Sequence, residues 1–464
     1  MEEMLYKFPD YNLLERENIE DNIDSIYKKQ EIEGFFKSFN VYIECNDIFY
    51  GINAVTYVIK LNPGTKLSKI KSYKQDLIMR FNAVDVKFEI SINGTGYLGI
   101  IIIKERKRTL KLGDLIGCTE VKTEKYKIPI ILGKDLKGNI CVEDLAQLPH
   151  LLIAGTTGTG KSTFLSTLII SILYKFNPNE LKLILVDTRA TNFSRFNKIP
   201  HLYIPVITKP NETEGVLINL INEMRHRYKL FGGKKVDNID EYNKISENKM
   251  PRLVLIIEDL YDLMMYTDKE VEQYIKVLTQ MSRAAGIHVV ISTQRPSINV
   301  ITGVIKSNIP ARMAFYVPSY IDSRTIIDKT GAEKLQVNGD IIFRKTGSEK
   351  DKRIQTPYIT DKEIEKIIEQ ISVGDESTLK TSEKIINNND KIDSKVYESD
   401  KPKEVMLKSN SITNVENNVK EINVQKKNDE ENNTDEMQEK SSIFNKWWFW
   451  VLTAIFVSII IVNL

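Results

Sequence analysis

One loop constrains the fold of this chain more than any other feature of its sequence. It reads Gly155-Thr156-Thr157-Gly158-Thr159-Gly160-Lys161-Ser162, an uninterrupted G-x-x-x-x-G-K-S. An apolar segment of strand length, HLLIAG, precedes it, and an apolar segment of helical length, STFLSTLIISILYKF, follows it. Glycines let a backbone wind tightly and turn its amide hydrogens towards phosphate oxygens at the positive end of a helix. Strand, loop and helix in this order predict a phosphate-binding α/β domain.

The residues that end the loop have separate expected tasks. Lys161 is expected to reach the β- and γ-phosphates of a nucleotide, and the Ser162 hydroxyl to complete the shell of a Mg2+ ion. Ser162 and Thr163 open the helix, so the whole run from Gly155 to Thr163 is the predicted nucleotide-binding segment. The alternative is a chance match in a turn rich in glycine and threonine. It is disfavoured because the strand before the loop and the helix after it are both present in the sequence.

Strands and helices alternate along 129–350, which predicts an α/β domain with a parallel sheet and helical crossovers. After the first strand, four more apolar runs are expected to be strands, namely LKLILVDT, RLVLIIEDL, HVVISTQ and ARMAFYV. In one class of P-loop enzymes, the strand before the phosphate loop and the strand that carries the metal-binding acid are not neighbours in the sheet. An additional strand lies between them. We expect LKLILVDT to be that intervening strand and RLVLIIEDL to be the acid-bearing strand.

Two adjacent acids at the end of RLVLIIEDL are the candidate catalytic pair. Glu258 is expected to hold Mg2+ with Ser162, and Asp259 to orient or deprotonate the attacking water. Gln294, at the end of HVVISTQ, supplies a polar tip that could sense the γ-phosphate. The alternative for Glu258 and Asp259 is a simple strand-ending turn. A GTPase is disfavoured because Asp187 is followed by Thr-Arg-Ala instead of completing D-x-x-G.

Composition excludes several other classes of site. Lys plus Arg number 65 and Asp plus Glu 63, so no bulk positive charge indicates a nucleic-acid partner, and any such contact must be local. The three cysteines lie far apart, which argues against a disulfide framework and a thiolate zinc site. The four histidines are also scattered, without metal-ligand spacing.

The residues before the P-loop domain divide into two expected parts. We predict a helical segment over 1–37 and a small α+β domain over 38–128. The strand-like runs of the small domain are VYIEC, VDVKFEISI and YLGIIII, and its helix-like run is LSKIKSYKQDLIMRF. A basic run, 104–108, follows the last strand. Such a run is either a solvated edge or a phosphate-facing patch.

The carboxyl-terminal part changes in character. A helix is predicted over 351–372, and a disordered tether over 373–442, where Asn, Lys, Glu, Asp and Ser dominate. Residues 443–464 are predicted to be a transmembrane tail anchor, because the 18 residues from Trp447 to Leu464 carry no charge and begin with an aromatic belt. This predicts a single-pass protein of the cell membrane with its nucleotide-binding domain in the cytoplasm. The alternative is a buried or oligomerising terminal helix.

Several strings beyond the loop resemble the motor portion of the FtsK/SpoIIIE family of DNA translocases. The resemblance spans 38–345 and rests on LPHLLIAGTTG at 148–158, IPHL at 199–202, NEMRHRYKL at 222–230, RAAGIH at 283–288, STQRPS at 292–297, VITGVIKSNIPAR at 300–312, IDSRTIID at 321–328 and GD at 339–340. It implies a RecA-like domain that binds ATP and Mg2+, with the small domain in the place of the family's β domain. It also implies a homo-hexamer around double-stranded DNA, with ATP between neighbours and Arg283 reaching the neighbouring γ-phosphate.

The chain departs from the family pattern in four ways. Family members usually read Asp then Glu where this chain has Glu258 and Asp259, which moves each carboxylate by about one bond and makes slow hydrolysis an expectation. Asp187-Thr188-Arg189 stands in place of Asp-Pro-Lys. No winged-helix domain follows the P-loop domain, and the predicted anchor is at the opposite end from the family's usual membrane spans.

Three functions remain open from the sequence. The first is an ATP-driven, membrane-tethered motor that moves double-stranded DNA in chromosome segregation or mobile-element transfer. The second is an ATPase of a protein secretion system, since some of these use domains of the same family. The third is a nucleotide-binding membrane scaffold with weak hydrolysis, for which the order of Glu258 and Asp259 is the motive.

Overall fold

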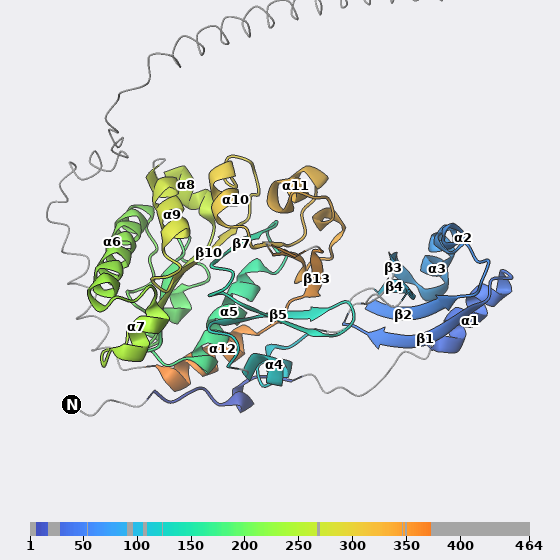
Figure 1. The fold of residues 1–464 in the computed structure, drawn as a ribbon, viewed down its shortest axis with the longest axis horizontal. Helices are drawn as coiled ribbons and strands as arrows, with labels where there is room; N and C mark the ends of the chain where they lie inside the picture. The colour runs from blue at the N-terminus through green and yellow to red at the C-terminus, as the bar shows by residue number, and fades with distance from the viewer. Residues whose placement is uncertain are drawn as a thin grey trace, which may run out of the picture. The chain divides into compact units, whose positions relative to one another are not determined.

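A computed structural model describes residues 6–16, 28–52, 54–90, 96–104, 109–122, 124–266, 270–345, 347–348 and 350–372 (Figure 1). The predicted tether at 373–442, the predicted membrane segment at 443–464 and most of the basic run at 104–108 lie outside these residues. Among the helices that are described, none combines the length and the apolar character needed to span a bilayer.

The small domain is a four-stranded antiparallel sheet with helices packed on one face. Its strands, in the order β1-β2-β4-β3, are β1 (Ile43–Tyr50), β2 (Ala54–Leu61), β4 (Leu98–Lys104) and β3 (Ala83–Ile90). Its helices are α1 (Lys29–Ser38), α2 (Leu67–Ser72) and α3 (Lys74–Phe81). The α+β prediction is therefore confirmed for this part of the chain, although β2 was missed. The six residues Ala54–Ile59 are all buried, so β2 has no polar alternation to mark it.

Two expected boundaries in the small domain differ from the structure. The predicted continuous helix is divided at Tyr73 into α2 and α3. Helix α1 crosses the predicted boundary at residue 37, and its Ile32, Phe35 and Phe36 lie in the core of the small domain. This helix therefore belongs to the small domain.

The second sheet has nine strands and holds the phosphate loop. Its order is β6-β5-β13-β12-β11-β7-β10-β9-β8. The five strands predicted from the sequence are β7 (His150–Ala154), β8 (Leu181–Val186), β9 (Arg252–Ile257), β10 (Ile287–Thr293) and β11 (Arg312–Ala314). They pair in parallel, as expected.

The expected position of LKLILVDT in the sheet was wrong. Strand β10 lies between β7 and β9, pairing Val289 with His150 on one side and Ile287 with Leu253 on the other. Strand β8, which contains LKLILV, lies beyond β9 at the edge. The order of strands along the chain does not fix their order in a sheet, because each crossover helix can return the chain to either side. As a result, the ends of β7, β10 and β9 are adjacent.

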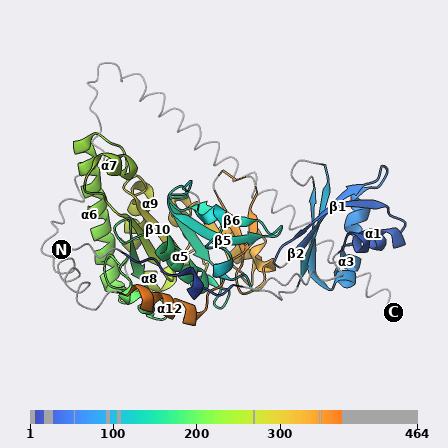
Figure 2. The same cartoon turned by 90° about the horizontal axis from the view of Figure 1, so that it is seen from below.

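Four antiparallel strands extend the parallel part beyond the prediction. They are β5 (Pro129–Asp135), β6 (Ile140–Asp144), β12 (Asp340–Arg344) and β13 (Lys352–Gln355). Strands β5 and β6 form a hairpin, visible in Figure 2. Strand β12 joins the parallel part through β11 and is followed by β13. The sheet is therefore mixed.

Helices cover both faces of this sheet (Figure 1). The core on one face takes residues from α5 (Lys161–Lys175), α4 (Thr119–Lys122) and α12 (Asp361–Ile371), as well as Leu14. The core on the other face takes residues from α6 (Pro210–Lys234), α8 (Leu260–Tyr266), α9 (Glu270–Met281), α10 (Gly303–Asn308) and α11 (Tyr320–Ile327). Leu151 and Ile153 of β7 face the first core, and Leu152 and Ala154 face the second. This alternation fixes the register of β7, and so the direction in which its loop leaves the sheet.

Candidate nucleotide-binding and catalytic site

The phosphate loop runs from the end of β7 to α5, which begins at Lys161. Two of its glycines are required by geometry. Gly160 has φ +109°, and a Cβ there would lie 2.9 Å from the Gly339 nitrogen. A Cβ at Gly155 would lie 2.6 Å from the Cβ of Phe315. These glycines let the loop wind against its neighbours before the helix starts, as the motif predicts.

Lys161 lies inside the turn of the loop. Its Nζ donates a hydrogen bond of 2.6 Å to the carbonyl oxygen of Thr156, and the side chain is 4% exposed. Burial lowers the pKa of Lys161 to about 8, although the carboxylates of Asp259 and Glu258 act in the opposite direction. A buried ammonium group that donates to one partner can donate to further oxygens, which suits a phosphate.

Glu258 connects the acid-bearing strand to the phosphate loop. The Ser162 hydroxyl donates to Glu258 Oε1 at 2.7 Å, and Asn192 Nδ2 donates to the same oxygen at 2.7 Å. The other oxygen, Oε2, is buried without a hydrogen-bond partner. Burial raises the pKa of Glu258 to about 7, and the nearby charges of Asp187 and Asp259 add to this effect.

These features fit a divalent cation. Glu258 Oε2 is a buried oxygen without a partner, and the Ser162 hydroxyl is bonded to the other oxygen, Oε1, of the same carboxylate. A hard cation such as Mg2+ takes hydroxyl, carboxylate and phosphate oxygens and needs only one or two protein carboxylates. The assignment of Ser162 and Glu258 as metal ligands, made from sequence, stays a prediction with this support.

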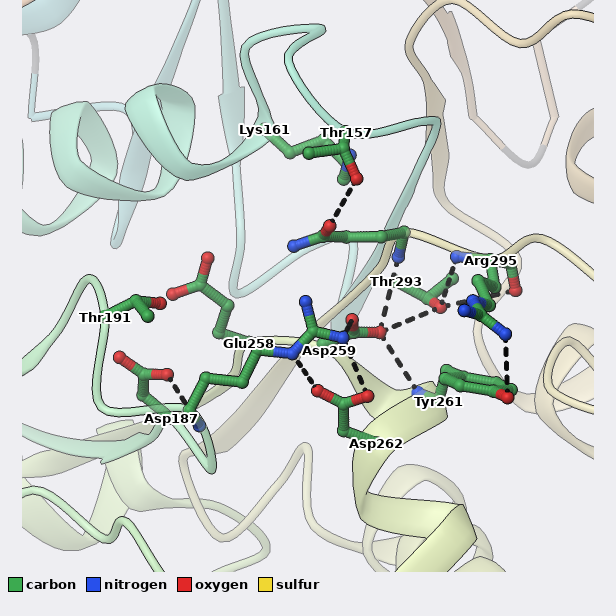
Figure 3. Close-up of polar contacts among 12 residues, drawn as sticks. Thr157, Lys161, Asp187, Thr191, Glu258, Asp259, Tyr261, Asp262, Thr293 and Arg295 are labelled. Atoms are coloured by element: carbon green, nitrogen blue, oxygen red, sulfur yellow. Dashed lines mark hydrogen bonds and ion pairs between the residues drawn. The ribbon is translucent and has the colours of Figure 1, made fainter.

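Asp259 has a left-handed backbone, with φ +81°, two residues after the end of β9. Its Oδ1 accepts weak hydrogen bonds from the Thr293 hydroxyl at 3.3 Å and from the amides of Tyr261 and Gln294 at 3.3 and 3.4 Å (Figure 3). Burial raises the pKa of Asp259. The carboxylate is thus held between the tips of β9 and β10, where an acid-base group of a P-loop enzyme is expected.

Arg189 is a functional candidate that sequence reasoning missed. Its Nη2 lies 3.2 Å from Asp259 Oδ2 and donates to Asp262 Oδ1 at 2.8 Å, while its Nε contacts the second oxygen of Asp262. The contact with Asp259 is an ion pair whose angle does not make a hydrogen bond. Sequence reasoning recorded Arg189 only as a departure from the family pattern, because nothing local indicates that it meets two acids about 70 residues away.

Asn192 and Asp187 shape the same edge of the site. The Asp187 carboxylate accepts from the backbone amides of Asn192 at 2.8 Å and Phe193 at 2.9 Å, which holds the loop that carries Asn192 beside Glu258. The sequence contained a signal that could have identified Asp187 as a site residue. Asp187 is the first residue after β8, just as Glu258 is the first residue after β9. Because parallel strands end at one edge, both acids lie near the phosphate loop.

Gln294 reaches the phosphate loop directly. Its Oε1 accepts a hydrogen bond of 2.7 Å from the Thr157 hydroxyl. This contact follows from β10 lying next to β7, so the tip of β10 faces the loop that begins at the tip of β7. The position suits the predicted role of sensing the terminal phosphate.

Arg283 does not join the cluster formed by Lys161, Ser162, Glu258, Asp259 and Gln294. It precedes β10, so it lies at the amino ends of the parallel strands, whereas the phosphate loop lies at their carboxyl ends. There it lines a separate cavity of about 710 Å³ that it shares with Arg252, Lys244 and Asp240. Arg283 therefore cannot serve the phosphate loop of its own chain. The action on a neighbouring copy that the family resemblance implies for Arg283 stays a prediction.

A cavity of about 610 Å³ opens above the phosphate loop. One side is formed by the loop and α5, with Gln294 at the edge, and the other side by segments far away in the chain. The residues of this second side are Thr109, Asn338, Gly339, Thr356, Pro357 and Tyr358. The size and the two-sided lining suit a nucleotide.

Comparison with solved structures finds the same fold. The structure of the pCW3 conjugation coupling protein TcpA, a monomer form with ATPgS, matches with a TM-score of 0.53 and 24% identity over 74% of this chain and 99% of that chain. The cytoplasmic domain of the type VII secretion ATPase EccC of Thermomonospora curvata matches with a TM-score of 0.50 and 18% identity, over 57% of this chain and 35% of that chain. At these identities the likeness concerns the fold.

Curated relatives match at higher identity. A DNA translocase FtsK of Clostridium tetani is 40% identical over 78% of this chain and 50% of its own length. Another, of Caldanaerobacter subterraneus, is 43% identical over 74% of this chain and 48% of its own length. The DNA translocase SftA of Bacillus subtilis is 38% identical over 79% of this chain and 39% of its own length. This chain thus spans about half the length of the first two relatives, or less in the case of SftA.

Two family models cover most of the described residues. The model of the FtsK/SpoIIIE family matches residues 111–298, which contain the phosphate loop, both acids, Arg283 and Gln294. The model described as the FtsK alpha domain matches residues 8–102, and so it covers the small domain for which the resemblance suggested the name β domain. With the site geometry, the fold and the relatives in agreement, the chain belongs to the FtsK/SpoIIIE family.

Proposed function

We propose that this chain hydrolyses ATP and uses the energy to move double-stranded DNA. The observation that carries the proposal is the hydrogen bond of 2.7 Å between Ser162 and Glu258, because it joins the phosphate loop to the acid pair. Membership of a family whose curated relatives are named DNA translocases supports DNA as the moved polymer.

The residues of the site divide the chemistry among them. The amides of the loop and the Lys161 ammonium group hold the β- and γ-phosphates, and Gln294 faces the terminal phosphate from the end of β10. Ser162 and Glu258 would hold Mg2+, which would neutralise charge on the phosphate oxygens when bound. Asp259 orients the attacking water and takes up its proton, since its Oδ1 is already anchored by three donors, its Oδ2 carries no hydrogen bond, and burial raises its pKa.

A ring of identical subunits completes the site. Arg283 lies at the opposite end of the sheet from its own phosphate loop, so it can reach a γ-phosphate only across an interface between copies. A head-to-tail arrangement that presents one copy's Arg283 to the next copy's loop forms a ring when the rotation between copies closes. We infer a homo-hexamer, the size that the family resemblance implies, with DNA in its centre.

DNA is favoured over a secreted protein as the substrate. Relatives that are 38–43% identical carry the name DNA translocase, whereas the likeness to a secretion ATPase, at 18% identity, concerns the fold alone. The net charge of +2 indicates that contacts with the DNA backbone are made by local patches, and such contacts weaken with salt.

The proposed location is the cell membrane. The uncharged segment from Trp447 to Leu464 is long enough to cross a bilayer as a helix, about 27 Å at ~1.5 Å per residue. The preceding polar stretch, 373–442, would act as a tether that leaves the ATPase domain in the cytoplasm.

Displacement of a third strand from DNA tests the proposal. The full chain, given ATP and a linear duplex that carries a triplex-forming oligonucleotide, is expected to release the oligonucleotide. Lys161→Ala is expected to lose this activity, and Lys175→Ala, a change at the other end of α5, to retain it. If the wild-type chain hydrolyses ATP and binds duplex but leaves the oligonucleotide in place, the translocation proposal fails.

A further inference from the structure

Backbone hydrogen bonds join the second side of the nucleotide cavity to the phosphate loop. The amide of Gly339 donates to the carbonyl of Thr159 at 2.7 Å, and the amide of Thr356 donates to the carbonyl of Gly339 at 2.7 Å. Two backbone hydrogen bonds in series thus link the phosphate loop to the end of β13. The segment 356–358 therefore has a fixed position relative to the loop.

The backbone of Tyr358 is held by two hydrogen bonds. Its amide donates to the carbonyl of Leu110 at 2.7 Å, and its carbonyl accepts from the amide of Leu112 at 2.9 Å. These bonds make an isolated parallel bridge between Lys111 and Tyr358. Tyr358 as a whole is 39% exposed and lines the cavity, so a fixed backbone presents a partly open aromatic residue to the ligand.

A cation keeps the ring in place on one side. The Lys111 ammonium group lies 5.4 Å from the ring centroid, and it is held there by an ion pair with Glu15 at 2.9 Å. The stem and charge of Lys111 therefore restrict rotation of the ring. An aromatic ring that is restrained before the ligand arrives loses little conformational entropy when a flat group stacks on it.

We propose that Tyr358 is the stacking platform for the nucleobase and that it sets the preference of this site for purine nucleotides. The inference rests on the proposed binding of nucleoside triphosphates. The two sides of the cavity differ in chemistry: Lys161, Ser162 and the loop amides suit the anionic phosphates, whereas Tyr358 and Pro357 offer a flat, uncharged surface. When the phosphates occupy the loop, the base is the part of the nucleotide left to meet Pro357 and Tyr358.

Stacking predicts a particular kind of selectivity. A purine covers more of an aromatic ring than a pyrimidine does, so ATP should bind more tightly than CTP, and this difference should depend on the ring of Tyr358. Inorganic tripolyphosphate has no base, so its binding should not depend on the ring at all.

Binding measured with three ligands separates these effects. Dissociation constants for ATPγS, CTP and tripolyphosphate, each with Mg2+, are measured by calorimetry on the full chain and on three variants. Tyr358→Leu removes the ring and keeps the bulk, Tyr358→Phe keeps the ring, and Tyr320→Leu removes an exposed ring of α11 as the matched control.

In Tyr358→Leu we expect ATPγS affinity to fall by about 10-fold or more, the loss typical of removing an aromatic ring from under a base. In the same variant CTP should fall less and tripolyphosphate should not change. Tyr358→Phe and Tyr320→Leu should bind like the wild type.

Each other outcome overturns the inference in a recognisable way. If Tyr358→Leu weakens tripolyphosphate as much as ATPγS, Tyr358 only supports the wall of the cavity. If Tyr358→Leu binds ATPγS like the wild type, the base lies elsewhere and nucleotide binding by the site still stands. If the wild type binds neither ATPγS nor tripolyphosphate, the proposed function fails, and this inference fails with it.

Discussion

The Ser162 hydroxyl donates to Glu258 at 2.7 Å and so joins the first turn of α5 to the tip of β9. The two residues are about 100 positions apart in the chain. Their contact orients the acid pair towards the phosphate loop. In the proposed function the two adjacent acids have different tasks, since Glu258 would hold the metal and Asp259 would act on the water.

Conservative amide substitutions test this division. Asp259→Asn should lower kcat by about 10²- to 10⁴-fold with little change in the Mg2+ dependence, because it removes only the acid-base group. Glu258→Gln should instead raise the Mg2+ concentration needed for half-maximal activity. Steady-state ATP hydrolysis measured over a range of Mg2+ concentrations distinguishes them. Equal Mg2+ dependence in both variants would contradict the assignment.

The raised pKa of Glu258 predicts that this residue makes the folded chain less stable as the pH rises. A carboxyl group whose pKa is lowered by folding has the reverse effect. Because burial raises the pKa of Glu258 from 4.5 to about 7, the folded chain keeps a proton that the unfolded chain releases between these values. The contribution to stability is present below pH ~4.5 and is lost as the pH rises through about 7. Without Mg2+ or nucleotide, Glu258→Gln should therefore be more stable than the wild type at pH 8, and the gap should close at pH 5.

Urea unfolding at the two pH values measures this gap. Glu369→Gln, a change of an exposed glutamate on α12, serves as the control and should show no such difference. A gap of the same size at pH 5 and pH 8 would show that Glu258 does not titrate as described.

Three buried histidines predict a loss of stability in mild acid. Burial lowers the pKa of His150 to about 3 and those of His201 and His288 to about 4. Between pH 6.5 and these values the unfolded chain binds protons that the folded chain does not, so stability falls as the pH falls. His201→Gln can keep a donor for the carbonyl of Phe176, which His201 Nε2 contacts at 2.8 Å. It should lose less stability than the wild type between pH 7 and 5, and an identical loss would contradict the prediction.

Mixing two inactive variants tests whether Arg283 acts between subunits. Arg283→Ala alone should lower hydrolysis by about 10³- to 10⁵-fold, as loss of a phosphate-contacting arginine does elsewhere. Lys161→Ala should be inactive as well. Mixed rings contain some interfaces with both an intact loop and an intact arginine, so a mixture of the two variants should regain part of the activity. Lys244→Ala, in the same cavity as Arg283, is the control and should stay active.

Two results would contradict action between subunits. One is full activity of Arg283→Ala alone. The other is a mixture that forms mixed rings, shown by crosslinking of differently labelled variants, and regains nothing.

The sequence predicted the local parts of the site well. The strand, loop and helix around Lys161 follow one another in the chain, so their pattern alone fixes their arrangement. The acids at the end of β9 and Gln294 at the end of β10 were found for a related reason, since the carboxyl ends of parallel strands meet at one edge of the sheet.

The parts that sequence missed depend on contacts between distant segments. The position of β10 between β7 and β9 is set by crossovers, and the apolar runs of β8 and β10 look alike. The ion pairs of Arg189 join the end of β8 to α8. On the second side of the cavity, an isolated bridge brings Lys111 beside Tyr358, and no periodicity in the sequence indicates this pairing.

The rate of ATP hydrolysis by the full chain, with and without linear duplex DNA, tests the central claim most directly. The account predicts that duplex DNA stimulates the wild-type rate and that Lys161→Ala stays at background under both conditions. If wild type and Lys161→Ala release phosphate at the same background rate in the presence of duplex DNA, this chain is not an ATP-driven DNA motor.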